Sequence, residues 1–274
     1  MALFLIESTK IVLVILAVIA TPLASGLFAG LANRMRLRRQ DGCDSPILQP
    51  FVDFSQLLRQ QPDSPDKTAM IAVLLQLAFA MLSLVLLVLQ RNLLAALALH
   101  LFSGLVAIVA TGNGITGAIK QQQMNSLKQY LTYQPVVLLA AAGCGLVAGS
   151  FGIDAMLGQN RPLIVELPLF WLSLLYVAYV FRQISTEADL SGPVLAASKL
   201  AGCFRQAGLL LFAGLFAADS LIMAGLIALL LGYGLSAADC LSNRFYCRVM
   251  TMGGERLIYF ACAINLTWVY IKYL

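Results

Sequence analysis

The sequence predicts an all-α integral membrane protein with about eight transmembrane helices and one short amphipathic helix on the cytoplasmic side. Of its 274 residues, 60% are hydrophobic and only 11% are charged, whereas about 25% of the residues of a soluble domain are charged. This composition excludes a soluble enzyme, a disordered chain and a disulfide-stapled secreted module. We therefore expect residues 1–274 to form a single polytopic membrane domain.

Eight apolar windows are candidates for membrane spans, because a helix needs about 20 residues to cross the hydrocarbon core. They cover residues 5–32, 69–90, 92–111, 131–150, 163–181, 203–218, 220–236 and 256–272. The first window continues through Leu31 and Ala32, which favours a retained helix over a cleaved signal peptide.

The distribution of basic residues predicts the orientation. With eight spans, fourteen of the 18 Lys and Arg residues fall on one side of the membrane. The other side receives only Lys10, Arg91, Arg161 and Lys272. The positive-inside rule places the richer side in the cytoplasm. We therefore expect a multi-pass protein of the cell inner membrane with both termini outside, in the periplasm. The predicted cytoplasmic loops are 33–68, 112–130, 182–202 and 237–255.

The loop 33–68 contains the predicted amphipathic helix. Apolar side chains recur at helical spacing, at Ile47, Phe51, Phe54 and Leu58. Gln49 and Asp53 lie on another face, and Pro50 suits a first helical turn. Such a helix lies in the membrane interface or docks a partner. The Arg cluster at 34–39 directly follows a span, so we interpret it as a topology determinant and expect no nucleic-acid partner.

The order of residues in this loop resembles a known family. Arg38-Arg39 is followed by Pro46-x-x-Gln49-Pro50-x-x-Asp53 and then by Leu57-Leu58-Arg59-Gln60. This order resembles the signature loop of the complex I membrane subunit at the quinone end. It is more similar to the relatives that anchor energy-converting nickel–iron hydrogenases and formate hydrogenlyases. Further segments follow in the family's order, among them Tyr130-Leu-Thr-Tyr-Gln134-Pro135 and Thr186-Glu187-x-x-Leu190-Ser191-Gly192.

The resemblance implies a non-catalytic membrane subunit of an oxidoreductase complex in electron transport, with a candidate role in proton translocation. The implied partners are hydrogenase-like large and small iron–sulfur subunits on the cytoplasmic side and antiporter-like membrane subunits in the bilayer. Nickel–iron and iron–sulfur centres are expected in those partners, and no cofactor or metal in this chain. The implied docking residues are Arg38, Arg39, Gln49, Asp53 and Arg59.

The chain departs from the family's pattern at positions that bear on function. Gln134 stands where the family has a glutamate, Gln56 stands where a lysine is usual, and most of the acidic loop before the sixth span is missing. These departures argue against quinone chemistry. The six cysteines form no CxxC or CxxH pair, which argues against a metal site.

Several residues are candidates for a proton path or for coupling. They are His100, Gln134, Glu166, Glu187, Asp189 and Asp239. His100, the only histidine, falls midway along the third window, with Gln76 on the preceding one as a candidate partner. A polar group at membrane depth is costly and usually marks function. The alternative interpretation, which we favour, is structural: His100 donates to a backbone carbonyl or to a neighbouring helix. No continuous acid relay is visible, because Gln134 cannot accept and release a proton.

Other classes of function stay open. A stand-alone secondary transporter would show inverted repeats and charges at mid-membrane, and the sequence shows neither clearly. A membrane-embedded enzyme acting on lipid or quinone, or a complex I-type quinone-reducing subunit, would show clustered acids or histidines at one membrane face. That cluster is missing from the sequence.

Overall fold

The described part of the protein is almost entirely helical. A computed structural model describes residues 2–40, 46–60, 67–110, 117–183, 190–241 and 254–273. The helices there are α1 (Ala2–Gln40), α2 (Gln49–Arg59), α3 (Lys67–Val88), α4 (Leu93–Ala110), α5 (Gly117–Ala148), α6 (Ile153–Leu157), α7 (Leu163–Glu166), α8 (Pro168–Gln183), α9 (Gly192–Ala217), α10 (Leu221–Leu241) and α12 (Gly254–Tyr273). The predicted all-α class is confirmed for these residues.

The predicted number of spans is confirmed only in part. Within the described residues, six helices are long and apolar enough to cross a membrane: α1, α3, α4, α5, α9 and α10. The fifth and eighth predicted windows coincide with α8 and α12, but neither helix is among these six. Every predicted window thus contains a helix, and six of them qualify as spans by length and composition.

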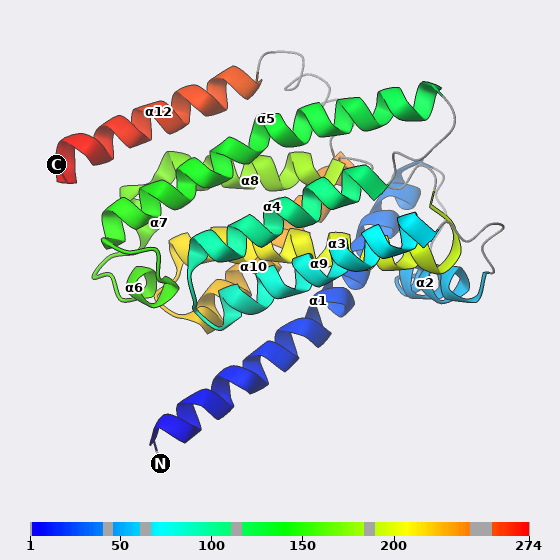
Figure 1. Ribbon diagram of the computed structural model, residues 1–274, viewed down its shortest axis with the longest axis horizontal. Coiled ribbons are helices and arrows are strands. Elements are labelled where there is room, and N and C mark those ends of the chain that lie inside the picture. Colours follow the sequence, from blue (N-terminus) through cyan, green and yellow to red (C-terminus); the bar gives the residue numbers. More distant parts are fainter. Residues whose placement is uncertain are drawn as a thin grey trace.

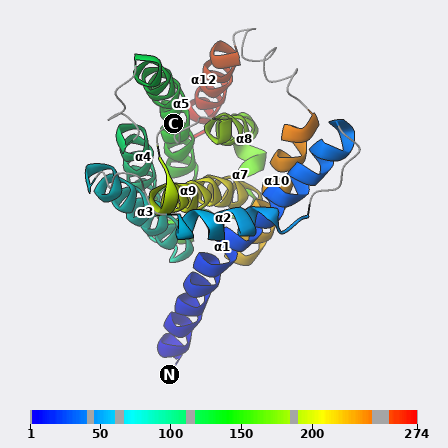
Figure 2. The same cartoon turned by 90° about the vertical axis from the view of Figure 1, so that its right-hand side faces the viewer.

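The helices form a bundle around α9. Figure 2 shows α9 with α3, α4, α5, α8 and α10 around it. In Figure 1, α2 lies at one end of the bundle, and the N- and C-terminal ends of the chain lie toward the other. The first half of α1 projects away from the bundle, and its side chains Val12 and Leu16 are more than 60% exposed.

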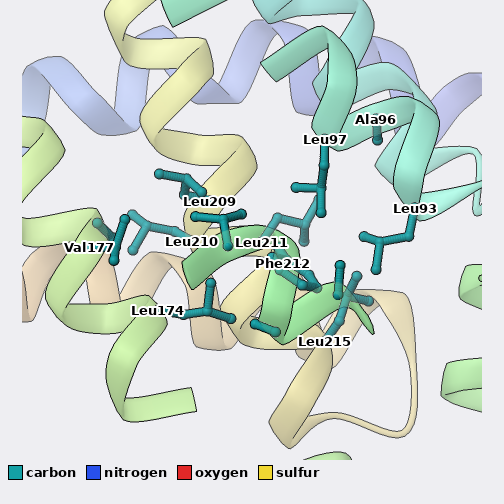
Figure 3. Close-up of a cluster of buried hydrophobic side chains, with 14 of the residues drawn as sticks. Leu93, Ala96, Leu97, Leu174, Val177, Leu209, Leu210, Leu211, Phe212 and Leu215 are labelled. Carbon is teal, nitrogen blue, oxygen red and sulfur yellow. The ribbon is translucent and has the colours of Figure 1, made fainter. Parts of the chain in front are cut away.

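The core lies where α4, α8 and α9 meet. Leu93 and Leu97 of α4, Leu174 and Val177 of α8, and Phe212 of α9 point toward one another in Figure 3 and are almost completely buried. Lipid tails are as apolar as these side chains, so close packing rather than exclusion of water stabilises this contact.

Two helices begin earlier than the apolar windows predict. Helix α5 begins at Gly117 and α9 at Gly192, so helix occupies parts of the predicted loops 112–130 and 182–202. Pro193 lies in the first turn of α9, where proline favours helix initiation. Hydropathy detects the apolar core of a helix and misses its polar first turns, which explains the difference.

Candidate functional site

The amphipathic helix α2 is seated on α1 through two glycines. The predicted helix is confirmed: α2 covers Gln49–Arg59 with Pro50 in its first turn. A side chain at Gly30 would overlap the backbone carbonyl of Ile47, and one at Gly26 would overlap the ring of Phe51. Small residues thus allow the start of α2 to lie directly against α1.

The outer surface of α2 carries the predicted docking residues. The side-chain amide of Gln49 donates a hydrogen bond to the carboxylate of Asp53, 2.7 Å away. Asp53 and Arg59 are exposed, as is Arg38 near the end of α1. Arg39 also lies in α1, but its side chain is outside the described part. No residue of α2 is buried, and Val52 and Leu58 are about half exposed. The helix therefore presents both polar and apolar groups.

A second group of polar residues lies inside the bundle, and we call it the interior polar cluster. It consists of Gln76 (α3), His100 (α4), Tyr130 and Gln134 (α5) and Arg205 (α9). All except Arg205 are at most 2% exposed. The hydroxyl of Tyr130 donates to the backbone carbonyl of His100 at 3.2 Å. The hydroxyl of Ser103, one turn along from His100, donates to the backbone carbonyl of Gln76 at 2.9 Å.

The register of α4 against α5 places His100 and Gln134 at the same level. The two helices are antiparallel: at one end the amide of Leu93 donates to the carbonyl of Phe151, and toward the other end Gln123 donates to the carbonyl of Ile108. Between these contacts Gly104 lies directly against the ring of Tyr130. His100 lies one turn before Gly104 in α4, and Gln134 lies one turn after Tyr130 in α5. Because the two helices are antiparallel, both steps go in the same direction along the bundle.

Several atoms of the cluster lack hydrogen-bond partners. Both amide atoms of Gln76, both of Gln134 and Nε2 of His100 are buried with no partner in the described part of the protein. Gln76, the candidate partner of His100, thus forms no side-chain hydrogen bond with it in the described part of the protein. Leaving a buried polar group unpaired costs about 1–3 kcal/mol, so the cluster has unused capacity for a bound molecule.

Sequence analysis missed Arg205, which it assigned to the cytoplasmic end of a span. Because α9 begins at Gly192, Arg205 lies about 20 Å along the helix, near its middle. Its guanidinium interacts electrostatically with both His100 and Tyr130. Recognising Pro193 as a helix start would have placed this charge inside the bundle.

Glu166 is the other candidate for a proton path whose side chain the structure describes, and its partner lies outside this cluster. Glu166 pairs with Lys272 where α7 meets α12. Asp239 lies in α10, but its side chain is outside the described part, and so are Glu187 and Asp189. Of the predicted residues that the structure describes, His100 and Gln134 lie at the same level of the bundle. Within the described chain, no group of three His, Cys, Asp or Glu residues could hold a metal ion.

A third feature is an apolar cavity of about 330 Å³ between α1, α3, α9 and α10. Aliphatic side chains such as Leu84 and Leu210 line most of it. Its polar members include Gln206, which donates to the carbonyl of Ala178, and Arg182, which donates to the hydroxyl of Ser236 at 2.8 Å.

Comparison with known proteins relates the fold to a respiratory assembly. No protein-family model and no curated protein matches the sequence. Among solved structures, the chain is similar to one from the membrane-bound sulfane sulfur reductase (MBS), an archaeal respiratory membrane complex. The TM-score is 0.77 at 16% sequence identity, and the match covers 95% of this chain and 99% of the other. The two chains share a fold over essentially their whole lengths.

Proposed function

We propose that this protein is a membrane subunit of a multi-subunit respiratory redox complex, related to energy-converting hydrogenases and formate hydrogenlyases. It anchors the peripheral electron-transfer arm, which holds the nickel–iron and iron–sulfur centres, and it contacts antiporter-like subunits in the bilayer. The observation that supports this proposal is the match, over nearly the whole of both chains, with a chain from an archaeal respiratory membrane complex.

The docking element in this proposal is α2. It lies at one end of the bundle, opposite the chain termini (Figure 1). The start of α2 packs against Gly26 and Gly30 of α1, which fixes its position. The hydrogen-bonded pair Gln49–Asp53 remains available on the outer surface of α2. The excess of Lys and Arg in the predicted loops 33–68, 112–130, 182–202 and 237–255 supports a cytoplasmic orientation for α2, with both termini in the periplasm.

Coupling to ion movement would not use an acid relay within the described interior. Helices α3, α4, α5, α8 and α9 contain no aspartate or glutamate. Proton transfer across this part of the chain would have to use His100, water or groups of other subunits. The proposed contribution of the chain is therefore mechanical: α2 transmits a rearrangement of the peripheral arm to the bundle.

Purification of the tagged chain in mild detergent tests the proposal. We expect co-purification of a hydrogenase-type large subunit, an iron–sulfur small subunit and antiporter-like chains, identified by mass spectrometry, with nickel and iron in stoichiometric amounts. A chain that purifies alone, stable and free of metal, would refute the complex and favour a stand-alone transporter.

The double variant Gln49→Ala with Asp53→Ala tests the docking role of α2. It removes the polar pair without touching the contacts with α1, so we expect loss of the peripheral subunits while the membrane chain stays intact. Ser55→Ala is the matched control, because the hydroxyl of Ser55 donates to the carbonyl of Val52 in the same helix. Retention of the arm by the double variant would exclude this face as the docking surface.

A quinone-type function is the second candidate, and the apolar cavity favours it. Its volume of about 330 Å³ suits a hydrophobic tail, and Arg182 and Gln206 lie among its lining residues. Leu210→Trp would fill the cavity from α9. If the complex reduces quinone through this cavity, the variant should lower quinone reduction while hydrogen turnover with an artificial acceptor is unchanged.

A further inference from the structure

The apolar cavity between α1, α3, α9 and α10 is long and narrow. Its lining residues run from Leu13 to Phe28 on α1 and from Leu221 to Ser236 on α10. At a rise of about 1.5 Å per residue, each of these stretches is about 22 Å long. A volume of about 330 Å³ spread over this length suits a linear, flexible chain. A compact ligand would fill only part of it, and a partner's transmembrane helix, about 10–12 Å across, is too wide.

The cavity opens on the outside of the bundle. Leu16 of α1 and Ile222 of α10 line it, and these side chains are 62% and 65% exposed. Both belong to helices that are long and apolar enough to span a membrane, so we expect the opening to face hydrocarbon. An empty apolar space would leave its lining side chains without packing contacts. An acyl chain of the surrounding bilayer supplies those contacts and enters without crossing water.

One end of the cavity is polar and carries a cation. Arg182, in the last turn of α8, donates to the hydroxyl of Ser236 at 2.8 Å, and both residues line the cavity. The chain leaves α8 and α10 for two predicted cytoplasmic loops shortly after these residues. Arg36 and Arg38, exposed near the end of α1, lie on the same predicted side. Basic residues at the cytoplasmic end of a span attract lipid phosphate.

A phospholipid matches both parts of the cavity. The planar guanidinium of Arg182 suits phosphate oxygens, which accept paired hydrogen bonds and carry the opposite charge. A quinone ring is neutral and offers the guanidinium no charge. We infer that the cavity binds one phospholipid of the cytoplasmic leaflet, with an acyl chain in its apolar part and the phosphate at Arg182. This inference uses only helices of this chain, so it does not depend on the proposed assembly.

Native mass spectrometry of the full-length chain, purified in mild detergent, tests the acyl-chain site. We expect the wild type to carry the added mass of one phospholipid, identified by fragmentation. Leu210→Trp from α9 and Ala228→Phe from α10 fill the cavity from two walls, and each should lower the phospholipid-bound fraction several-fold. Leu75→Trp is the matched control and should retain the lipid, because Leu75 lines a separate apolar groove between α3 and α4. A bound quinone instead of a phospholipid, no bound lipid, or an unchanged bound fraction in both filled variants would refute the inference.

Arg182→Gln tests the position of the phosphate. It removes the charge at the polar end and leaves the apolar part of the cavity unchanged, so the phospholipid-bound fraction should again fall several-fold. Arg161→Gln is the matched control, because it removes an exposed arginine that does not line the cavity. If Arg182→Gln binds as much phospholipid as the wild type, or if Arg161→Gln loses as much as Arg182→Gln, the phosphate is not held at Arg182.

Acids that could pair with Arg182 enter the same test. Asp239 lies one turn beyond Ser236 on α10, and Glu187 and Asp189 follow α8 in the sequence, but their side chains are outside the described part. A guanidinium has five N–H donors, so an acid and a phosphate can share it. Asp239→Asn removes a competitor of the phosphate, so its phospholipid-bound fraction should equal or exceed that of the wild type. A fall as large as in Arg182→Gln would mean that Arg182 acts through this acid, and would overturn its assignment to the phosphate.

Discussion

Lys272 forms an ion pair with Glu166 and thereby joins the last turn of α12 to the short helix α7. Next to this pair the helical hydrogen bonding is interrupted between α7 and α8. The backbone amide of Leu169, in the first turn of α8, donates to the side chain of Asn265 at 3.2 Å. Both contacts connect α12 to the same break. Glu166 therefore has a structural partner, and its predicted place in a proton path has no support from its neighbours.

The first prediction concerns this ion pair. Lys272 is 42% exposed and Glu166 12%, and exposed pairs contribute only about 0.2–1 kcal/mol. Glu166→Gln should lower the free energy of unfolding by less than about 1 kcal/mol and leave proton translocation by the assembled complex unchanged. The charge-swapped double variant Glu166→Lys with Lys272→Glu should recover the stability. If the Glu166→Gln complex assembles normally but no longer translocates protons, Glu166 belongs to the proton path and the prediction is wrong.

The second prediction concerns the contact between Gly104 and Tyr130. A Cβ at position 104 would overlap the tyrosine ring, so Gly104→Ala should destabilise the fold by about 1–3 kcal/mol, as overpacking does. Gly202→Ala in α9 is the matched control, because nothing lies within 4 Å of its added Cβ. Alanine favours helix, so the control should be neutral or stabilising. Denaturant titration of both purified variants measures the difference, and equal stability would contradict the register of α4 against α5.

The third prediction concerns the attachment of α12 to α5. The hydroxyl of Tyr259 in α12 donates to the backbone carbonyl of Thr132 in α5. Tyr259→Phe should therefore cost about 0.5–1.5 kcal/mol. Hydrogen exchange should show faster opening of α12 in the variant, whereas exchange in α3 and α4 should stay as in the wild type. Uniform acceleration across the bundle would mean that α12 does not open separately.

The sequence was sufficient to predict the longer helices, but not the short helix α6. Each of the eight apolar windows contains a helix. The spacing of Phe51, Phe54 and Leu58 predicted α2, because an amphipathic pattern depends only on the local order of residues. The resemblance to complex I-related anchors, drawn from the loop around Gln49 and Asp53, agrees with the fold match to a respiratory complex. Local pattern and fold class thus followed from the residues alone.

The interior of the bundle could not be predicted in the same way. His100 was expected midway along the third window and Gln134 near the start of the fourth, but their common level depends on the register of α4 against α5. Arg205 was assigned to the cytoplasmic end of a span because the apolar window began only at residue 203, whereas α9 begins at Gly192. Packing between helices that are distant in sequence decides which polar groups lie close together. A local sequence pattern does not predict such packing.

The last prediction concerns the seat of α2, on which the docking role depends. A Cβ at Gly30 would overlap the backbone carbonyl of Ile47, and backbone cannot move aside as a flexible side chain can. Gly30→Ala should therefore displace the start of α2 from α1 and accelerate hydrogen exchange over residues 49–59. Gly225→Ala in α10, whose added Cβ meets nothing within 4 Å, should leave that exchange unchanged. If α2 transmits the rearrangement of a peripheral arm, Gly30→Ala should also weaken retention of the arm although no outer residue has changed. If hydrogen exchange over residues 49–59 is faster but the peripheral arm is fully retained and coupling is unchanged, the proposed function of α2 does not depend on its position against α1.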